Sequence, residues 1–225
     1  MHVISFIGFK GGIGRTTSAA ALSVGFATMG MHVAVIDAGF AVPLVERNCS
    51  KFDGLGSIPS KRRLQRTIEE RPLALPAENR PFVRSVASTA HFEDVIEELR
   101  VAGCSHVVVD TPAHQVPVVF ATALISSLLI VPIRYPVDVP SVSTSVEDDF
   151  VATSGSMRFL ISSTLQSQEI RQMLHPRAIL NTELPHGLFD TLDDESPTAG
   201  QTHGQVWQAS CVSLAYEVSK LLDDE

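Results

Sequence analysis

The residues best suited to chemistry lie in one short segment near the N-terminus, between an apolar run and an alanine-rich stretch. In order, this segment reads Lys10, Gly11, Gly12, Ile13, Gly14, Arg15, Thr16 and Thr17. Glycines let backbone N–H groups turn inward toward a phosphate, and a helix that begins after such a loop adds donors and the positive end of its dipole. A hydroxyl beside the loop cation, here Thr16, can bind Mg²⁺. The segment therefore predicts a phosphate-binding loop and not a glycine-rich turn with a chance basic residue.

Two carboxylates stand at the ends of predicted strands, near where a metal-bound phosphate would need them. Asp110 ends the apolar run His106–Asp110, which is the Walker B pattern, and Asp37 ends the run His32–Asp37. Aspartate is common at strand ends in α/β folds, so either residue alone indicates little. In one chain with the loop, the two carboxylates reinforce the prediction of a phosphate and Mg²⁺ site.

The elements that must position these residues alternate along the chain. Strands are predicted at His2–Phe6, His32–Asp37, His106–Asp110, Leu128–Ile133, Met157–Ser162 and Arg177–Asn181, and helices at Thr16–Met29, His91–Ala102, Val118–Ser126, Val137–Ala152, Gln166–Leu174 and Gln205–Leu222. Ala38–Ser60 and Asp190–Gly204 show neither pattern and are interpreted as loops. This alternation, with continuous apolar strands, predicts an α/β fold that is doubly wound, with helices on both faces of a mostly parallel sheet. The length of 225 residues fits a single domain, residues 1–225.

The formal charge of −8 is unevenly distributed. Residues 1–140 carry 13 basic and 12 acidic side chains, whereas residues 141–225 carry 4 and 13, so the two parts have net charges of +1 and −9. This excludes a uniformly basic nucleic-acid coat and leaves room for a local patch between Arg47 and Arg71, where 7 cations stand against 3 acids. The densest part of that patch comprises Lys61, Arg62, Arg63 and Arg66. If helical, it would form one basic face, which is either a salt-sensitive DNA-binding surface or an ordinary solvated one.

No segment is interpreted as a membrane anchor. The uncharged stretch Thr111–Ile133 is interrupted by prolines, which suit a buried helix and a buried strand better than one spanning helix. The closing helix is followed by Asp223, Asp224 and Glu225, whereas a helix that lies on anionic lipid is basic. Three widely spaced cysteines without a CxxC pair are interpreted as buried free thiols in a cytoplasmic protein.

Three segments resemble one known family. The run from Lys10 to Thr17 resembles the deviant Walker A motif, K-G-G-x-G-K-[ST]-[ST], of the ParA/MinD-type P-loop ATPases. Val107 to Pro112 is similar to the Walker B strand of that family, and the stretch from Leu129 to Asp138 is similar to its strand, proline and aspartate segment. The resemblance is best with small plasmid-partition ParA proteins and VirC-type proteins of T-DNA transfer.

The resemblance implies ATP or ADP and Mg²⁺ as ligands, with a role for each matched residue. Lys10 would be the signature lysine that reaches the partner's nucleotide across a dimer interface, and Thr16 would hold Mg²⁺ with Asp110 in a supporting position. The residues implied around the nucleotide are Gly11, Gly12, Ile13, Gly14, Arg15, Thr16, Thr17 and Pro132. The expected catalytic residues are Lys10, Arg15 and Asp37.

The resemblance also implies partners. Such proteins form ATP-dependent sandwich homodimers, bind DNA nonspecifically and are stimulated by a partner protein, here of the ParB-like or relaxosome type. They position plasmids or other cargo, which places this chain in the cytoplasm, in association with the nucleoid or a cell pole.

The sequence departs from the family pattern at three places. The second lysine of the motif is replaced by Arg15, which keeps the charge but is bulkier and planar. Gly39 stands where the family has the second aspartate of an Asp-x-Asp pair, and Ser162-Ser163 stands where an asparagine or arginine usually lies near the adenine. A missing general base can cost about 10²–10⁴-fold in rate, so Arg15 and Gly39 predict nucleotide binding with slow or absent hydrolysis.

Three functions are therefore compared. The first is a ParA-like ATPase that partitions or positions plasmid or DNA cargo, and the second is a nonhydrolysing ParA-like adaptor that recruits partner proteins or DNA-transfer complexes. The third is a metabolic enzyme with a related loop, such as dethiobiotin synthetase or a nitrogenase-type iron protein. No cysteine spacing supports a cluster, and the K-G-G form of the loop favours the positioning branch.

Overall fold

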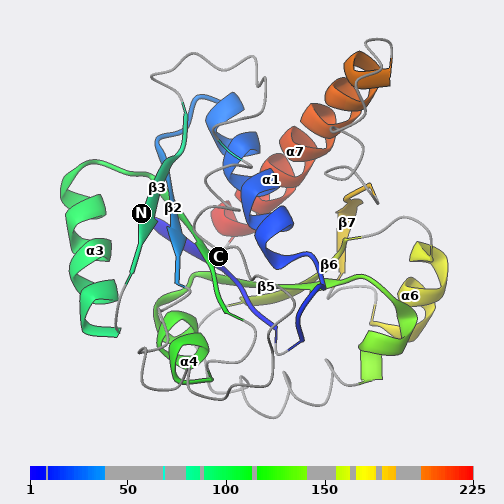
Figure 1. Cartoon of the computed structure of the whole chain (residues 1–225), viewed down its shortest axis with the longest axis horizontal. Coiled ribbons are helices and arrows are strands. Elements are labelled where there is room, and N and C mark those ends of the chain that lie inside the picture. Colours follow the sequence, from blue (N-terminus) through cyan, green and yellow to red (C-terminus); the bar gives the residue numbers. More distant parts are fainter. Residues whose placement is uncertain are drawn as a thin grey trace, which may run out of the picture.

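The computed structural model describes residues 1–8, 10–38, 68, 80–86, 89–112, 116–140, 156–162, 166–175, 179–185 and 199–224. The strands are β1 (His2–Phe6), β2 (Val33–Asp37), β3 (Phe82–Ser85), β4 (His106–Asp110), β5 (Leu128–Ile133), β6 (Ser156–Ile161) and β7 (Ile179–Glu183). The helices are α1 (Arg15–Thr28), α3 (Thr89–Val101), α4 (Val116–Ile125), α6 (Ser167–Met173) and α7 (Ala199–Asp223), with one 3₁₀ turn, η3 (Pro136–Asp138). Figure 1 shows how they surround a central sheet.

The sheet has seven strands in the order β3-β2-β4-β1-β5-β6-β7, and every pairing in it is parallel. The predicted doubly wound α/β fold is therefore confirmed. The first strand, β1, lies at the centre with β4 on one side and β5 on the other. In open parallel sheets, the crevice at the carboxyl ends of the central strands is where ligands bind. The fold thus brings the segment after β1 to that crevice.

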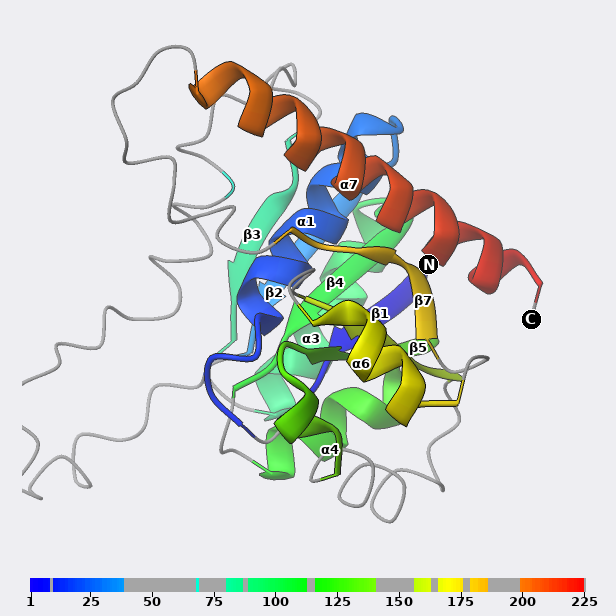
Figure 2. The same ribbon diagram turned by 90° about the vertical axis from the view of Figure 1, so that its right-hand side faces the viewer.

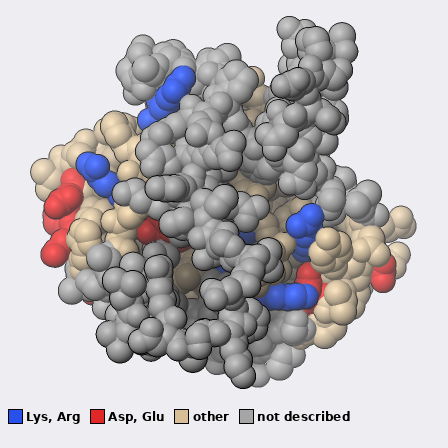
Figure 3. Space-filling model, in the orientation of Figure 1, with Lys and Arg blue, Asp and Glu red and all other residues tan. Residues whose placement is uncertain are grey.

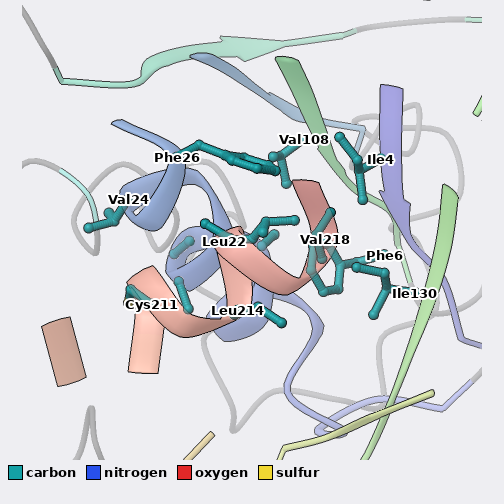
Figure 4. Close-up of a cluster of buried hydrophobic side chains, with 14 of the residues drawn as sticks. Ile4, Phe6, Leu22, Val24, Phe26, Val108, Ile130, Cys211, Leu214 and Val218 are labelled. Atoms are coloured by element: carbon teal, nitrogen blue, oxygen red, sulfur yellow. The ribbon is translucent and has the colours of Figure 1, made fainter. Parts of the chain in front are cut away.

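The strands bury both of their faces because side chains alternate between them. On one face, Ile4, Val35 and Val108 belong to a cluster that also contains the buried side of α1 and of α7. On the other face, the strands pack against α3 in one cluster and against α4 and α6 in another. Figure 2 shows α1 lying between the sheet and α7. The close-up in Figure 4 shows side chains of both helices meeting those of the strands.

Helix α1 is enclosed on all sides, and its composition reflects this. Ten consecutive residues, 18–27, are buried, and five of them are alanine or glycine. A Cβ atom added at Gly25 would lie 2.0 Å from the backbone carbonyl oxygen of Cys211 in α7. Glycine is therefore needed here so that α7 can cross α1 closely, which holds the first helix firmly against the sheet.

Apart from shifts of one or two residues at the ends of elements, the described elements differ from the predicted ones at three places. Strand β3 was not predicted, because Phe82–Ser85 is short, lies at the sheet edge and alternates exposed with half-buried residues. Helix α7 begins at Ala199, so the last residues of the predicted loop Asp190–Gly204 are helical. The predicted helix Val137–Ala152 begins with η3, and its part beyond residue 140 lies outside the described residues.

Two further predictions concern single residues and the membrane. As predicted, Cys104 and Cys211 are buried and form no disulfide within the described part of the chain, whereas Cys49 lies outside the described residues. Within the described part of the chain, none of the helices combines the length and the apolar character that crossing a bilayer requires.

Candidate functional site

The predicted phosphate-binding loop connects the central strand β1 to α1. Helix α1 begins at Arg15 with Gly14 as its N-cap, and the amide of Ser18 donates to the carbonyl oxygen of Gly14 at 2.8 Å. Gly14 has φ +93°, in the left-handed region that favours glycine, and a Cβ added there would lie 3.0 Å from Ser162 Oγ. The backbone conformation and the neighbouring side chain both require glycine at this position, as the motif predicts.

The side chain of Lys10 forms an ion pair with Asp138. Its Nζ lies 2.5 Å from Asp138 Oδ1 in η3, after β5. The two side chains differ in environment, since that of Lys10 is 59% exposed and that of Asp138 is 2% exposed. The ion pair thus joins the start of the loop to the proline and aspartate segment, and it keeps the lysine at the surface of the molecule.

The arginine that replaces the second motif lysine is held inside the loop. Arg15 Nη1 donates to the carbonyl oxygen of Gly8 at 2.7 Å, which closes the loop across its base. Burial lowers the pKa of Arg15, and the carboxylate of Asp110 opposes this effect. A buried guanidinium beside a carboxylate remains a cation, so the loop retains a positive charge at the position where the family has lysine.

The two predicted carboxylates are brought together at the carboxyl edge of the sheet. Asp37 ends β2 and Asp110 ends β4, and the two residues are direct partners in the register of these strands. Both are buried, at 2% and 4% exposure. The backbone holds this edge in place, because the amide of Ala38 donates to the Asp110 carbonyl oxygen and Thr111 Oγ1 donates to the Phe6 carbonyl oxygen.

Two further side chains touch the loop from neighbouring strands, and the sequence analysis did not assign them to the loop. Arg134, directly after β5, donates from Nη1 to the carbonyl oxygen of Gly12 at 3.4 Å. Ser162, directly after β6, donates from Oγ to the carbonyl oxygen of Ile13 at 2.8 Å. The sequence carries a partial signal for both, since each is a polar residue directly after a strand, but only the structure shows that β5 lies beside β1 and that β6 lies beside β5.

The remaining predicted site residues lie around this centre or outside the described part. Thr16 and Thr17 are half-buried in the first turn of α1, and Gly11 and Gly12 are exposed in the loop. Pro132 is buried within β5, where it pairs with Leu160 of β6. The positions outside the described residues are Gly39, Lys61, Arg62, Arg63, Arg66 and Ser163.

The strand, loop and helix at the centre of an all-parallel sheet define a P-loop protein with a doubly wound α/β fold. A protein-family model described as an AAA domain matches residues 1–42, which contain β1, the loop, α1 and β2. No curated protein sequence matches the chain.

Solved structures are similar to nearly the whole chain. A chain of the MinC:MinD cell division protein complex from Aquifex aeolicus has 17% identity and a TM-score of 0.58, with 98% of this chain and 96% of that chain covered. The septum site-determining protein MinD with Mg-ADP from Pyrococcus horikoshii OT3 has 18% identity and a TM-score of 0.54, with 98% and 96% covered. The pNOB8 ParA structure bound to nonspecific DNA has 12% identity and a TM-score of 0.54, with 97% and 99% covered. These identities establish a shared fold. The fold expected from the motif resemblance is therefore confirmed, and the family-model match covers the loop on which that resemblance rests.

Proposed function

We propose that this chain is a ParA-like protein that binds ATP with Mg²⁺, dimerises on ATP and positions plasmid or other DNA cargo, with hydrolysis weakened by Arg15 and Gly39. One observation carries the proposal. The loop after β1 combines a left-handed Gly14, the cation of Arg15 and two buried carboxylates on neighbouring strands. Phosphate needs the amides and the cation, and its metal ion needs the carboxylates.

The residues present fit Mg²⁺ because their donor atoms are oxygens. The Thr16 hydroxyl would hold the ion, and the carboxylate of Asp110 would support it, with that of Asp37 on the adjacent strand. When bound, Mg²⁺ would neutralise part of the phosphate charge. The similar MinD structure from Pyrococcus horikoshii OT3 supports this pairing, since it is a complex with Mg-ADP.

The signature lysine supports the dimer in this proposal. Lys10 is exposed at the face that carries the loop, and it forms an ion pair with Asp138 of the same chain. In a sandwich dimer, Lys10 would exchange this carboxylate for the phosphates of the partner's nucleotide. Dimerisation would then depend on ATP because the phosphates replace the anion that the lysine leaves.

Weak hydrolysis is proposed from the two departures in the motifs. Arg15 donates a hydrogen bond to the carbonyl oxygen of Gly8, so its guanidinium already has a partner within its own loop. Glycine at position 39 has no side chain to orient an attacking water. We expect the double variant Arg15→Lys plus Gly39→Asp to hydrolyse ATP faster than the wild type by at least about tenfold, because a general base contributes about 10²–10⁴.

The test measures binding and turnover separately. Equilibrium titration with a fluorescent ATP analogue, with and without Mg²⁺, tests whether the loop binds nucleotide. Single-turnover hydrolysis of radiolabelled ATP by the wild type, each single variant and the double variant then tests the departures. Absence of Mg²⁺-dependent binding would refute nucleotide binding, and wild-type hydrolysis equal to that of the double variant would refute the weakened site.

A second function follows if hydrolysis is absent altogether. The chain would then be a nonhydrolysing ParA-like adaptor that recruits partner proteins, of the ParB-like or relaxosome type, or a DNA-transfer complex. The contact between Arg15 and Gly8 favours it, because an arginine already bonded within the loop is less available to a developing phosphate charge. A wild-type protein that dimerises on ATP without releasing phosphate would establish this alternative.

DNA binding is proposed through the cluster that comprises Lys61, Arg62, Arg63 and Arg66, which lies outside the described residues. On the face seen in Figure 3, blue and red side chains of the described residues are interspersed and do not form one basic field. Replacing the four cations with serine should abolish salt-sensitive binding to a random duplex. Replacing four exposed cations outside the cluster with serine, Arg80, Arg84, Arg100 and Lys220, provides the control because it changes the net charge by the same amount. Unchanged binding by the cluster variant would refute the assignment.

A further inference from the structure

We infer that Arg134 and Ser162 are positioning residues that orient two successive amides of the phosphate-binding loop, those of Ile13 and Gly14. The inference rests on the proposed function only in assuming that the amides meet a phosphate. It extends that function by giving the ends of β5 and β6 a direct part in shaping the loop.

The contacts lie on consecutive peptide groups. Arg134 donates a hydrogen bond to the carbonyl oxygen of Gly12 at 3.4 Å, and Ser162 donates one to the carbonyl oxygen of Ile13 at 2.8 Å. In a planar trans peptide, the carbonyl and the following N–H point in opposite directions. The N–H of Ile13 therefore points away from Arg134, and the N–H of Gly14 points away from Ser162.

The backbone of this segment has the alternation that an anion-binding nest requires. Gly12 and Gly14 have φ values of +79° and +93°, whereas Ile13 between them does not have a positive φ. Alternating signs of φ turn successive N–H groups toward one concave side, where they bind anions. Gly12 is exposed and has no atom within 4 Å of an added Cβ, so its own packing does not hold this conformation.

Ser162 is anchored through its backbone to the strand that precedes Arg134. The amide of Ser162 donates to the carbonyl oxygen of Ile133 at 2.9 Å, and Ile133 directly precedes Arg134. The side chain of Ile13 is buried and reaches Gly8, where an added Cβ would lie 2.5 Å from its Cδ1 atom. The loop is thus held from below by Ile13 and from the side by the ends of β5 and β6.

This arrangement explains one departure from the family pattern. Position 162 was expected near the adenine, with serine in place of the asparagine or arginine usual in the family. In the structure, the Ser162 hydroxyl donates a hydrogen bond to the carbonyl oxygen of Ile13 in the loop. A larger side chain would meet Gly14, because the Cβ position of Gly14 is only 3.0 Å from Ser162 Oγ. Serine at position 162 is therefore suited to orient the loop.

The experiment uses the full chain with selective ¹⁵N labelling of isoleucine and glycine. Without nucleotide, Arg134→Ala should shift the amide resonance of Ile13, and Ser162→Ala should shift that of Gly14. Each variant should also weaken binding of Mg²⁺ with N-methylanthraniloyl-ADP by roughly two- to tenfold, the effect of one hydrogen bond. Arg134→Gln keeps an N–H donor without the charge, so it should retain most of the affinity that Arg134→Ala loses.

Matched controls remove an arginine and a serine elsewhere. Arg100 is exposed and pairs with Glu97, and Ser210 donates to a carbonyl oxygen within α7, so Arg100→Gln and Ser210→Ala should change neither amide nor affinity. Unchanged resonances of Ile13 and Gly14 in both alanine variants would overturn the inference. A second result would also overturn it: Arg134→Gln and Arg134→Ala bind nucleotide equally weakly, and neither variant shifts the Ile13 amide resonance. Arg134 would then act through its charge on the phosphates and not through the loop. If the wild type binds no nucleotide, the proposed function fails, and the two resonances alone decide this inference.

Discussion

The ion pair between Lys10 and Asp138 predicts that its two partners contribute unequally to stability. The Lys10 side chain is 59% exposed and that of Asp138 is 2% exposed, so only the lysine can be solvated by water when its partner is removed. In Asp138→Asn, the lysine turns into solvent, and the loss should be about 1 kcal/mol, as for other pairs with an exposed partner. In Lys10→Met, the carboxylate stays buried without its cation, and the loss should be about 3 kcal/mol.

The measurement is the free energy of unfolding in urea for the wild type, both single variants and the double variant. Trp207 is the sole tryptophan of the chain and is 4% exposed in α7, so its fluorescence reports loss of the packing between α7 and the rest of the core. The double variant should be close in stability to Asp138→Asn, because the methionine no longer faces a carboxylate. The coupling energy of the cycle should therefore be about 3 kcal/mol in magnitude, and larger than for an exposed pair.

A second pair in the same molecule provides the reference. Glu97 and Arg100 are three residues apart on α3, and both side chains are 60% exposed. The corresponding variants, Glu97→Gln and Arg100→Met, should show a coupling of at most about 0.5 kcal/mol. The reasoning is refuted if Lys10→Met costs no more than Asp138→Asn, or if the two cycles give equal coupling energies.

Two further predictions concern positions away from the site. Gly25→Ala should lower the free energy of unfolding in urea by about 1–3 kcal/mol, because its Cβ would meet the Cys211 carbonyl oxygen. Gly11→Ala should be nearly neutral, because nothing lies within 4 Å of the new methyl group. Equal losses in the two variants would contradict this account. Burial, with the nearby charges of His2 and the N-terminus, lowers the pKa of His106 to about 4 from 6.5, so the unfolded chain takes up a proton first as the pH falls. The free energy of unfolding should therefore decrease by at most about 3 kcal/mol between pH 6.5 and 4 and stay level below. His106→Gln should remove this slope, whereas the control His175→Gln, at an exposed histidine, should keep it.

Much of the fold could be predicted because the central strands are continuously apolar. The bounds of β1, β4 and β5 agree with those predicted, and each of these strands is buried along nearly its whole length. Strand β3 was missed because it is a short edge strand that buries little, with exposed residues alternating with half-buried ones. The start of α7 was missed because residues 199–204 include two glycines and three hydrophilic side chains, which carry no apolar periodicity.

The site was predictable where chemistry depends on neighbours in sequence, and not where it depends on neighbours in space. Glycine at position 14 and the strand-end aspartates follow from the motif, and the structure places all of them at one edge of the sheet. The contacts of Arg134 and Ser162 depend on the strand order, in which β5 lies beside β1 and β6 lies beside β5. That order has no local signal, because a crossover joins strands that are distant in sequence.

The cations around the loop interact with buried carboxylates of the fold, and in the proposed function they also attract the phosphate. Three carboxylates, those of Asp37, Asp110 and Asp138, are buried at this edge, and three cations, those of Lys10, Arg15 and Arg134, lie around the loop beside them. A phosphate that attracts these cations weakens their interaction with the carboxylates, and a buried carboxylate without a cation is costly. A divalent metal ion restores the missing positive charge at the same edge. Nucleotide and Mg²⁺ should therefore bind cooperatively, because each relieves the charge imbalance that the other would create alone.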